Sequence, residues 1–227
     1  KYKEQISGTY YTTRGGSFGM SAMTVNTNAD GADISAPSES LSSNNITADK
    51  VVIDSTATGE GNAYGMFALA QRSWSLTPPS TWETNARNLI QAKGNQLDLT
   101  INAVSASGKA HSMYAEGFGN ATVSNVTNTI LGGSGADTIK LTGDVTSVSS
   151  VSGSNVRNYV NTGTGNDNIT LNGFMSAKGE GASNYFEVGA GTDLVTINGG
   201  MRAENKGENE VNHAETVNIN LTAAGIC

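Results

Sequence analysis

Short stretches of alternating apolar and polar residues recur along the chain. In NITL, alternation puts Ile169 and Leu171 on one face of a strand and the polar residues between them on the other. Similar stretches are KVVID at 50–54, LDLTI at 97–101, TIKL at 138–141 and LVTI at 194–197. The pattern predicts many short β-strands, each with an apolar face that must be buried.

These stretches are spaced like an internal repeat anchored on aspartate. The anchors are Asp49, Asp98, Asp137, Asp167 and Asp193. A second strand-like segment follows each anchor, beginning at Gly61, Gly108, Gly153, Gly181 and Gly207. Such a unit cannot close its own core, so stacked copies are expected to bury their apolar residues as ladders. We therefore predict an all-β fold, a right-handed parallel β-helix or β-solenoid, in one domain spanning residues 1–227.

Three regions of this domain are expected to differ. Residues 1–45 alternate like strands but lack the full unit, which predicts atypical N-terminal capping rungs. Residues 70–93 are an insertion, and residues 94–227 form the regular rungs. The insertion predicts a short α-helix, because Ser80 and Glu83 have the spacing of a capping box. Gly94 could end that helix, whose apolar face would carry Trp82, Ala86, Leu89 and Ile90.

Composition limits the environment and the partners. Only 37% of the residues are hydrophobic and 28 are glycine, which suits short strands and many turns. The net charge is −7 without a run of basic residues, so nucleic acid is not an expected partner. No apolar stretch is long enough for a transmembrane segment. Cys227 is the only cysteine, which excludes an internal disulfide and favours an extracellular or bacterial cell-surface repeat protein.

Three of the anchors follow a pair of glycines two residues apart. The pairs are Gly133 and Gly135 before Asp137, Gly163 and Gly165 before Asp167, and Gly189 and Gly191 before Asp193. Glycine permits a sharp turn and lets carbonyl oxygens converge where an aspartate supplies a carboxylate. Carbonyl and carboxylate oxygens are ligands that Ca²⁺ prefers. The motif therefore predicts a calcium site at each corner.

The motif resembles the calcium-binding nonapeptide of haemolysin-type, or RTX, proteins. GGSGADTIK at 132–140 has every specified residue, and TGTGNDNIT at 162–170 and VGAGTDLVT at 188–196 lack only the first glycine. The resemblance implies that Asp137, Asp167 and Asp193 are the side-chain ligands, with carbonyls of residues 132–136, 162–166 and 188–192. In that family the nonapeptides run in tandem, whereas here they are separated, so calcium could lie only between stacked loops.

The alternative is that these corners are turns without a metal. Carboxylates stacked at a strand spacing of roughly 4.8 Å repel each other by about 1–3.5 kcal/mol. A divalent cation would relieve that repulsion, and so would hydrogen bonds from backbone N–H groups in an Asx-type turn. The sequence leaves both explanations open.

Catalytic motifs are not found in the sequence. His111 and His213 lie in separate repeats and are expected to face solvent or cap turns. The protein is therefore not expected to be an enzyme. A polysaccharide-active enzyme is an alternative that would need cations and carboxylates on one face, drawn from Arg157, Lys178, Arg202, Glu180 and Glu187.

Aromatic residues gather around the insertion. They are Tyr64, Phe67, Trp74, Trp82 and Tyr114. These side chains would pack the helix against the strands, or form a platform for a glycan or cell-surface ligand at residues 70–93. The predicted function is an extracellular structural or adhesive module stabilised by calcium. A self-assembling subunit of a surface fibre, associating without metal through the N-terminal strands and residues 215–227, is the alternative.

Overall fold

Every element in the described part of the chain is a β-strand. The computed structural model describes residues 17–27, 39–73, 83–119, 121–205 and 207–221. Its strands are β1 (Ser17–Thr27), β2 (Glu39–Thr47), β3 (Lys50–Ala57), β4 (Ala63–Ser73), β5 (Glu83–Gln91), β6 (Asp98–Ser105), β7 (Ala110–Gly119), β8 (Val123–Leu131), β9 (Thr138–Thr142), β10 (Asp144–Ser149), β11 (Ser154–Asn161), β12 (Asn168–Lys178), β13 (Ser183–Glu187), β14 (Leu194–Ala203), β15 (Glu208–Asn212) and β16 (Thr216–Leu221).

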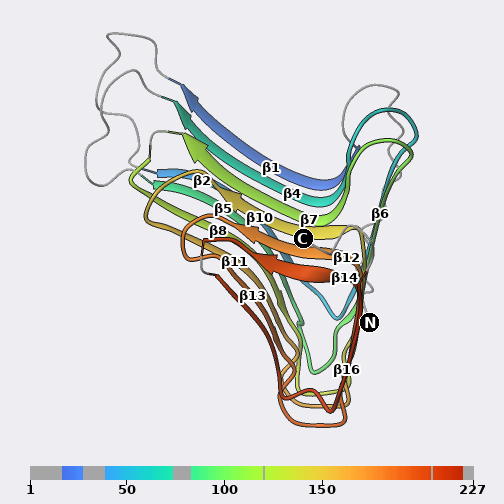
Figure 1. The fold of residues 1–227 in the computed structure, drawn as a ribbon. Coiled ribbons are helices and arrows are strands. Elements are labelled where there is room, and N and C mark those ends of the chain that lie inside the picture. Colours follow the sequence, from blue (N-terminus) through green and yellow to red (C-terminus); the bar gives the residue numbers. More distant parts are fainter. Residues whose placement is uncertain (1–16, 28–38, 74–82, 120, 206, 222–227) are drawn as a thin grey trace.

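The strands form two sheets in which every described pairing is parallel. The ten-stranded sheet follows the order β1-β4-β7-β10-β12-β9-β6-β3, with β14 beside β12 and β16 beside β14. The six-stranded sheet has the order β15-β13-β11-β8-β5-β2. The chain visits both sheets in turn, and we call one such passage a circuit. Figure 1 shows successive circuits lying side by side in sequence order, from blue β1 to red β14.

The ten-stranded sheet curls back on itself. The long strand β12 pairs with β9 through Asn168–Asn172 and with β10 through Met175–Lys178, so two arms of the sheet meet there. The far ends of these arms, β1 and β3, also touch, because the Ser55 hydroxyl donates a hydrogen bond of 2.9 Å to the Ser17 carbonyl. The sheet is therefore nearly closed, like the wall of a barrel.

The predicted fold class, a right-handed parallel β-helix or β-solenoid with a short inserted α-helix, is wrong. The described residues contain strands and no helix, and they form two parallel sheets, of which the larger is nearly closed. The error has a local cause at residues 83–91, which were expected to be helical. They form β5, which pairs along its length with β2 and β8.

Buried polar residues hide the period of β5. Thr84, Ala86, Asn88 and Ile90 point inward and are all 0% exposed, which is the period of two that a strand requires. Because two of these four residues are polar, only the spacing of Ala86 and Ile90 remained visible, and it also fits a helix. Residues 80–82, where the helix was expected to begin, lie outside the described part of the chain.

The second strand-like segments of the predicted repeat are not equivalent to one another. Those beginning at Gly61 and Gly108 lead into β4 and β7 of the ten-stranded sheet. Those beginning at Gly153, Gly181 and Gly207 lead into β11, β13 and β15 of the six-stranded sheet. In the first two units, the strands that correspond to β11, β13 and β15 in the six-stranded sheet are β5 and β8, not β4 and β7. The second half of the repeat was therefore aligned wrongly in these two units.

The apolar core is built from ladders in which register partners stack. One ladder contains Ile53, Ile101, Leu141, Leu171 and Ile197, none more than 1% exposed. Each circuit thus adds one side chain to a continuous row, and burial of each row excludes water from the space between the sheets.

A ladder of asparagines crosses the interior beside this core. In the six-stranded sheet, each asparagine Nδ2 donates to the Oδ1 of the next at 2.7–2.9 Å. The members are Asn44, Asn88, Asn128, Asn158, Asn184 and Asn209. All but Asn209 are at most 2% exposed. A buried amide is stable only when its donors and acceptor are satisfied, and the stacking satisfies them.

The same amides tie the two sheets together. The second Nδ2 hydrogen of Asn128 is directed to the Thr146 carbonyl at 2.7 Å, and that of Asn158 to the Ser176 carbonyl at 2.9 Å. Asn44, Asn88 and Asn184 bond in the same way to the carbonyls of Phe67, Tyr114 and Arg202. The asparagine ladder therefore fixes the position of β4, β7, β10, β12 and β14 at one residue in each strand.

Loss of one rung of this ladder should be costly. We expect Asn128→Ala to lower the free energy of unfolding by about 2–4 kcal/mol, because it leaves one N–H of the buried Asn88 amide and the Oδ1 of the buried Asn158 amide without a partner. Denaturant unfolding followed by circular dichroism measures the change. The matched control is Asn198→Ala, which breaks a similar but exposed pair of asparagine bonds and should cost no more than about 0.5 kcal/mol. Equal effects would contradict the account.

Candidate functional site

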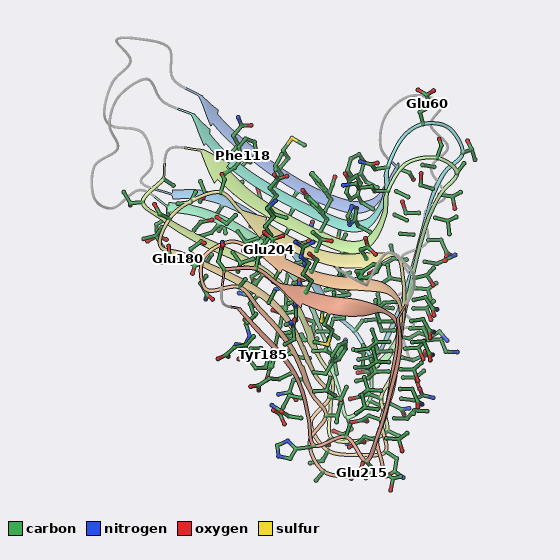
Figure 2. The ribbon with its side chains drawn as sticks, in the orientation of Figure 1. Glu60, Phe118, Glu180, Tyr185, Glu204 and Glu215 are labelled. Carbon is green, nitrogen blue, oxygen red and sulfur yellow. The ribbon has the colours of Figure 1, made fainter. Side chains whose placement is uncertain are left out.

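The three predicted metal-ligating aspartates lie in one row at the corner where the chain enters the ten-stranded sheet. Asp137, Asp167 and Asp193 directly precede β9, β12 and β14 and are only 1–2% exposed. Glu215 continues the row, since it accepts a hydrogen bond of 2.6 Å from the Asp193 amide. Figure 2 shows Glu215 at the narrow end of the molecule, where the turns between the two sheets converge.

Each carboxylate in this row holds the circuit before it. The Leu97 amide donates to Asp137 Oδ1 at 2.5 Å, the Asp137 amide to Asp167 Oδ1 at 2.8 Å, and the Asp167 amide to Asp193 Oδ1 at 2.8 Å. Hydrogen bonds to a charged acceptor are stronger than neutral ones. The aspartates thus act as links between neighbouring circuits.

Burial opposes the charge on these aspartates. Desolvation raises the pKa of Asp137 and of Asp167 above the usual value, and the charge of the next aspartate in the row raises each further. Hydrogen bonds act in the other direction: the Leu97 and Gly133 amides lower the pKa of Asp137. The repulsion expected between stacked carboxylates is therefore present, and backbone N–H groups offset part of it.

The paired glycines are required by the close approach of the corners. Gly163 and Gly189 have φ of 80° and 74°, and a Cβ there would lie 2.3 Å and 1.5 Å from the carbonyl oxygen of the corresponding glycine one circuit earlier, Gly133 and Gly163. Gly165 and Gly191 approach Gly135 and Gly165 in the same way. The glycines are explained by this stacking whether or not a metal is bound.

The corner offers few free oxygens to a cation. Both oxygens of Asp137 accept amide hydrogens, from Leu97 and Gly133. Asp167 Oδ2 and Asp193 Oδ2 are buried without a hydrogen bond of normal geometry. Over the described residues, no three His, Cys, Asp or Glu side chains form a group that could hold a metal, and Ca²⁺ takes six to eight oxygens. Calcium at these corners stays a prediction from the sequence.

The two earlier anchors differ from the other three. Asp49 occupies the corner row, and its Oδ1 accepts a hydrogen bond of 2.5 Å from the Gly94 amide. Asp98 is one residue out of register: it pairs with Lys50, whose ammonium lies 2.9 Å away, and Leu97 takes its place in the row. The aspartate repeat was therefore misaligned by one residue at this circuit.

A second candidate site begins with stacked aromatic rings on the outer side of β1, β4 and β7. Phe18 stacks on Tyr64, with ring centroids 5.1 Å apart, and Tyr64 stacks on His111 at 5.4 Å. Phe67 stacks on Tyr114 at 5.6 Å in a parallel row. Tyr64, Phe67 and Tyr114 were predicted either to pack a helix against the strands or to form a platform for a glycan, and the described residues contain no helix for them to pack against. Comparison of AYGMFA with AHSMYA could have revealed the rows, because aromatic rings recur at matching positions.

The aromatic rows stop at β7, and a groove begins there. At β10 and β12 the row of Tyr114 continues with Thr146 and Ser176, which are too small to cover its ring. The resulting groove has a volume of about 580 Å³. We call it the aromatic groove; it is lined by Asn62, Tyr64, Ser107, Gly108, Lys109, His111, Tyr114, Thr146, Val148, Ser176 and Lys178.

The groove combines a neutral aromatic wall with two cations. Burial, and secondarily the charge of Lys109, lowers the pKa of His111 to about 4, so His111 is neutral at pH 7. Its Nδ1 lies 3.1 Å from Thr146 Oγ1. Burial and the neighbouring Glu116 raise the pKa of Tyr114, whose hydroxyl donates to Glu116. The lysine ammonium groups supply hydrogen-bond donors to the same groove.

The structure separates the remaining candidates. His111 is 5% exposed and stacked, so the expectation that it faces solvent or caps a turn is wrong, whereas His213 lies in an exposed turn beside Glu187. The charged residues considered for an enzyme do not all share one face: Lys178 and Arg202 lie on the ten-stranded sheet, where Arg202 is the register partner of Ser176, whereas Arg157 lies on the six-stranded sheet. Trp74 and Trp82 lie outside the described residues.

The end of the stack at β16 was expected to support self-association. Val217 and Ile219 are 41% and 49% exposed, although their register partners Val195 and Ile197 are fully buried. This end therefore leaves apolar residues uncovered, and self-association through it stays a prediction. A search of the described residues found no helix long and apolar enough to cross a membrane.

No family model matches the chain, and no curated protein or solved structure matches it either. The similarity to the RTX repeat therefore remains a resemblance of three short motifs.

Asp137 and Asp193 provide a test of what holds the corners. Asp137→Asn should lower the free energy of unfolding by about 1–3 kcal/mol, because one of its two amide donors would then face an NH₂ group. Asp193→Asn should cost less than Asp137→Asn: Oδ1 still accepts the Asp167 amide, and relief of the repulsion with Asp167 offsets the cost of an NH₂ group in place of the unbonded Oδ2. Thermal unfolding in calcium and in EDTA measures both.

The comparison of melting temperatures in calcium and in EDTA can contradict the claim that backbone hydrogen bonds alone stabilise the corners. A melting temperature that rises in calcium, with the rise abolished by Asp193→Asn, would show that a cation bound to the folded corner provides the stability.

Proposed function

We propose that the protein is an extracellular structural module with an adhesive role, and that its aromatic groove binds carbohydrate on a partner surface. The observation that carries this proposal is the end of the aromatic rows at β7, which leaves the rings of His111 and Tyr114 beside a groove. An open ring face beside polar side chains is the arrangement that binds the apolar C–H face of a sugar while its hydroxyls form hydrogen bonds.

The polar groups of the groove suit hydroxyl-rich ligands. Thr146 and Ser176 present hydroxyls at successive positions of one row, and Lys109 and Lys178 present ammonium donors. His111 is buried edge-on against the Tyr114 ring and is neutral above its pKa of about 4, so it supports that ring without adding charge. Several weak contacts of this kind favour a polysaccharide, because a polymer engages many copies of the module at once.

The rigidity of the groove also supports a binding role. The carbonyls of Tyr114, Thr146 and Ser176 each accept an amide hydrogen of the asparagine ladder, so the outer side chains at these residues are held at fixed spacing. A preformed site loses little conformational entropy on binding. That the protein is not an enzyme remains an expectation from the sequence.

Affinity electrophoresis in gels containing neutral or acidic polysaccharides tests the proposal. We expect at least one polysaccharide to retard the protein, and Tyr114→Ala to weaken that retardation about tenfold. Ser176→Trp should abolish it by filling the groove while leaving the interior unchanged. The matched control is Phe118→Ala, since Phe118 lies on the same strand, is labelled in Figure 2 and does not line the groove.

Two results would overturn the proposal. The first is equal retardation of wild type and Ser176→Trp in every polysaccharide that retards the protein. The second is the absence of any retardation across the panel. Circular dichroism of each variant shows that a loss of binding is not a loss of folding.

A further inference from the structure

A second groove lies on the outer face of the six-stranded sheet. It has a volume of about 460 Å³ and crosses β5, β8 and β11. Arg87 and Arg157 both line it and are both in register with Thr127. Their Cα atoms are therefore two strands apart, which is about 10 Å at the usual strand spacing. We call this the arginine groove. Neither the aromatic groove nor the aspartate row shares a residue with it.

The two arginines form no ion pair among the described residues, and Glu208, two strands from Arg157 in register, is bonded to the Tyr185 hydroxyl instead. The ion pairs between described residues are Lys50 with Asp98, Arg202 with Glu204 and His213 with Glu187. Neither Arg87 nor Arg157 belongs to one, although the chain as a whole has a net charge of −7. Two unpaired guanidinium groups in one groove of an acidic protein indicate that the groove is suited to an anion.

Arg157 is held in position before any ligand arrives. Its guanidinium carbon lies 4.1 Å from the centroid of the Tyr159 ring and 5.0 Å from that of Tyr185, which Figure 2 labels on β13. Its Nε is buried without a hydrogen-bond partner. Stacking on aromatic rings restrains the planar group, and its N–H donors then form a fork that matches a carboxylate or sulfate. Such preorganisation lowers the entropic cost of binding.

Neutral amides complete the groove. Asn125 and Asn155 are register partners on β8 and β11 and line it beside the arginines. Asparagine side chains both donate and accept, which suits hydroxyl groups. Asn85, the register partner of Asn125 on β5, donates to Glu83 at 3.0 Å. The groove therefore offers two cations for anionic groups, one of them held by aromatic rings, and amides for hydroxyls.

We infer that the arginine groove binds an anionic oligosaccharide, with carboxylate or sulfate groups at Arg87 and Arg157 and sugar hydroxyls at the asparagines. A nucleic acid fits less well. Phosphate backbones need more cations than two, and the Tyr159 ring, on which bases could stack, is already covered by Arg157. This inference is independent of the aromatic groove and of any carbohydrate bound there.

Isothermal titration calorimetry at low salt, with four probes, tests the inference. The probes are an oligogalacturonate, a sulfated dextran oligosaccharide, an uncharged dextran oligosaccharide and a single-stranded DNA oligonucleotide. We expect an anionic sugar to bind with an affinity that falls as salt rises, and the uncharged dextran not to bind. Binding of the oligogalacturonate alone identifies a carboxylate site, and binding of the sulfated probe alone identifies a sulfate site.

Variants locate the site. Arg87→Ala combined with Arg157→Ala should weaken binding at least tenfold. Arg157→Lys keeps the charge and the fold but loses the planar fork, and should also weaken binding severalfold. The matched control is Arg202→Ala, which removes an exposed arginine from the other sheet and should leave the affinity unchanged. Tyr114→Ala should also leave it unchanged, which separates this site from the aromatic groove.

Four outcomes would overturn the inference. They are failure of both anionic sugars to bind, equal binding of uncharged dextran, tighter binding of DNA than of either sugar, and equal loss of affinity in Arg202→Ala. The third would indicate a nucleic-acid site, and the fourth a non-specific attraction to positive charge.

Discussion

The structure depends on a row of buried amides that have to find partners. An asparagine side chain placed between two sheets is destabilising unless both of its N–H donors and its oxygen form hydrogen bonds. Here Asn88, Asn128 and Asn158 meet this requirement by bonding to the asparagines of the neighbouring circuits and to a carbonyl of the opposite sheet. A change in register by one residue would break every such bond at once. The amides therefore select one alignment of the circuits, which apolar contacts alone would specify less sharply.

The same requirement connects the interior with the surface. The carbonyls that accept from the ladder belong to Tyr114, Thr146 and Ser176, whose side chains form a wall of the aromatic groove. On the six-stranded sheet, Arg157 precedes Asn158, so a side chain of the arginine groove is adjacent to a ladder member. At the corners, aspartates use amide hydrogens in a similar way to join successive circuits. The aromatic groove and the arginine groove thus lie on strands whose positions the buried asparagine ladder determines.

The sequence predicted strands but not the arrangement of the early circuits. Alternation was clear where the inward residues are apolar, as at Ile169 and Leu171. It was hidden in β5, because Thr84 and Asn88 are polar residues buried in inward positions, and composition normally places such residues at the surface. The spacing of Gly-x-Gly-x-Asp correctly marked three equivalent corners, but it could not distinguish hydrogen bonds from a cation. The grooves depend on register across strands far apart in the chain, which single-sequence patterns do not contain.

Side-chain amide hydrogen exchange, followed by nuclear magnetic resonance on ¹⁵N-labelled protein, tests the central claim most directly. The account predicts slow exchange of the NH₂ groups of the buried ladder members, Asn44, Asn88, Asn128, Asn158 and Asn184. The exposed Asn209 and the outer pair Asn198 and Asn220 should exchange at once. Fast exchange at all of these asparagines alike would contradict a buried, hydrogen-bonded ladder and the alignment of circuits that depends on it.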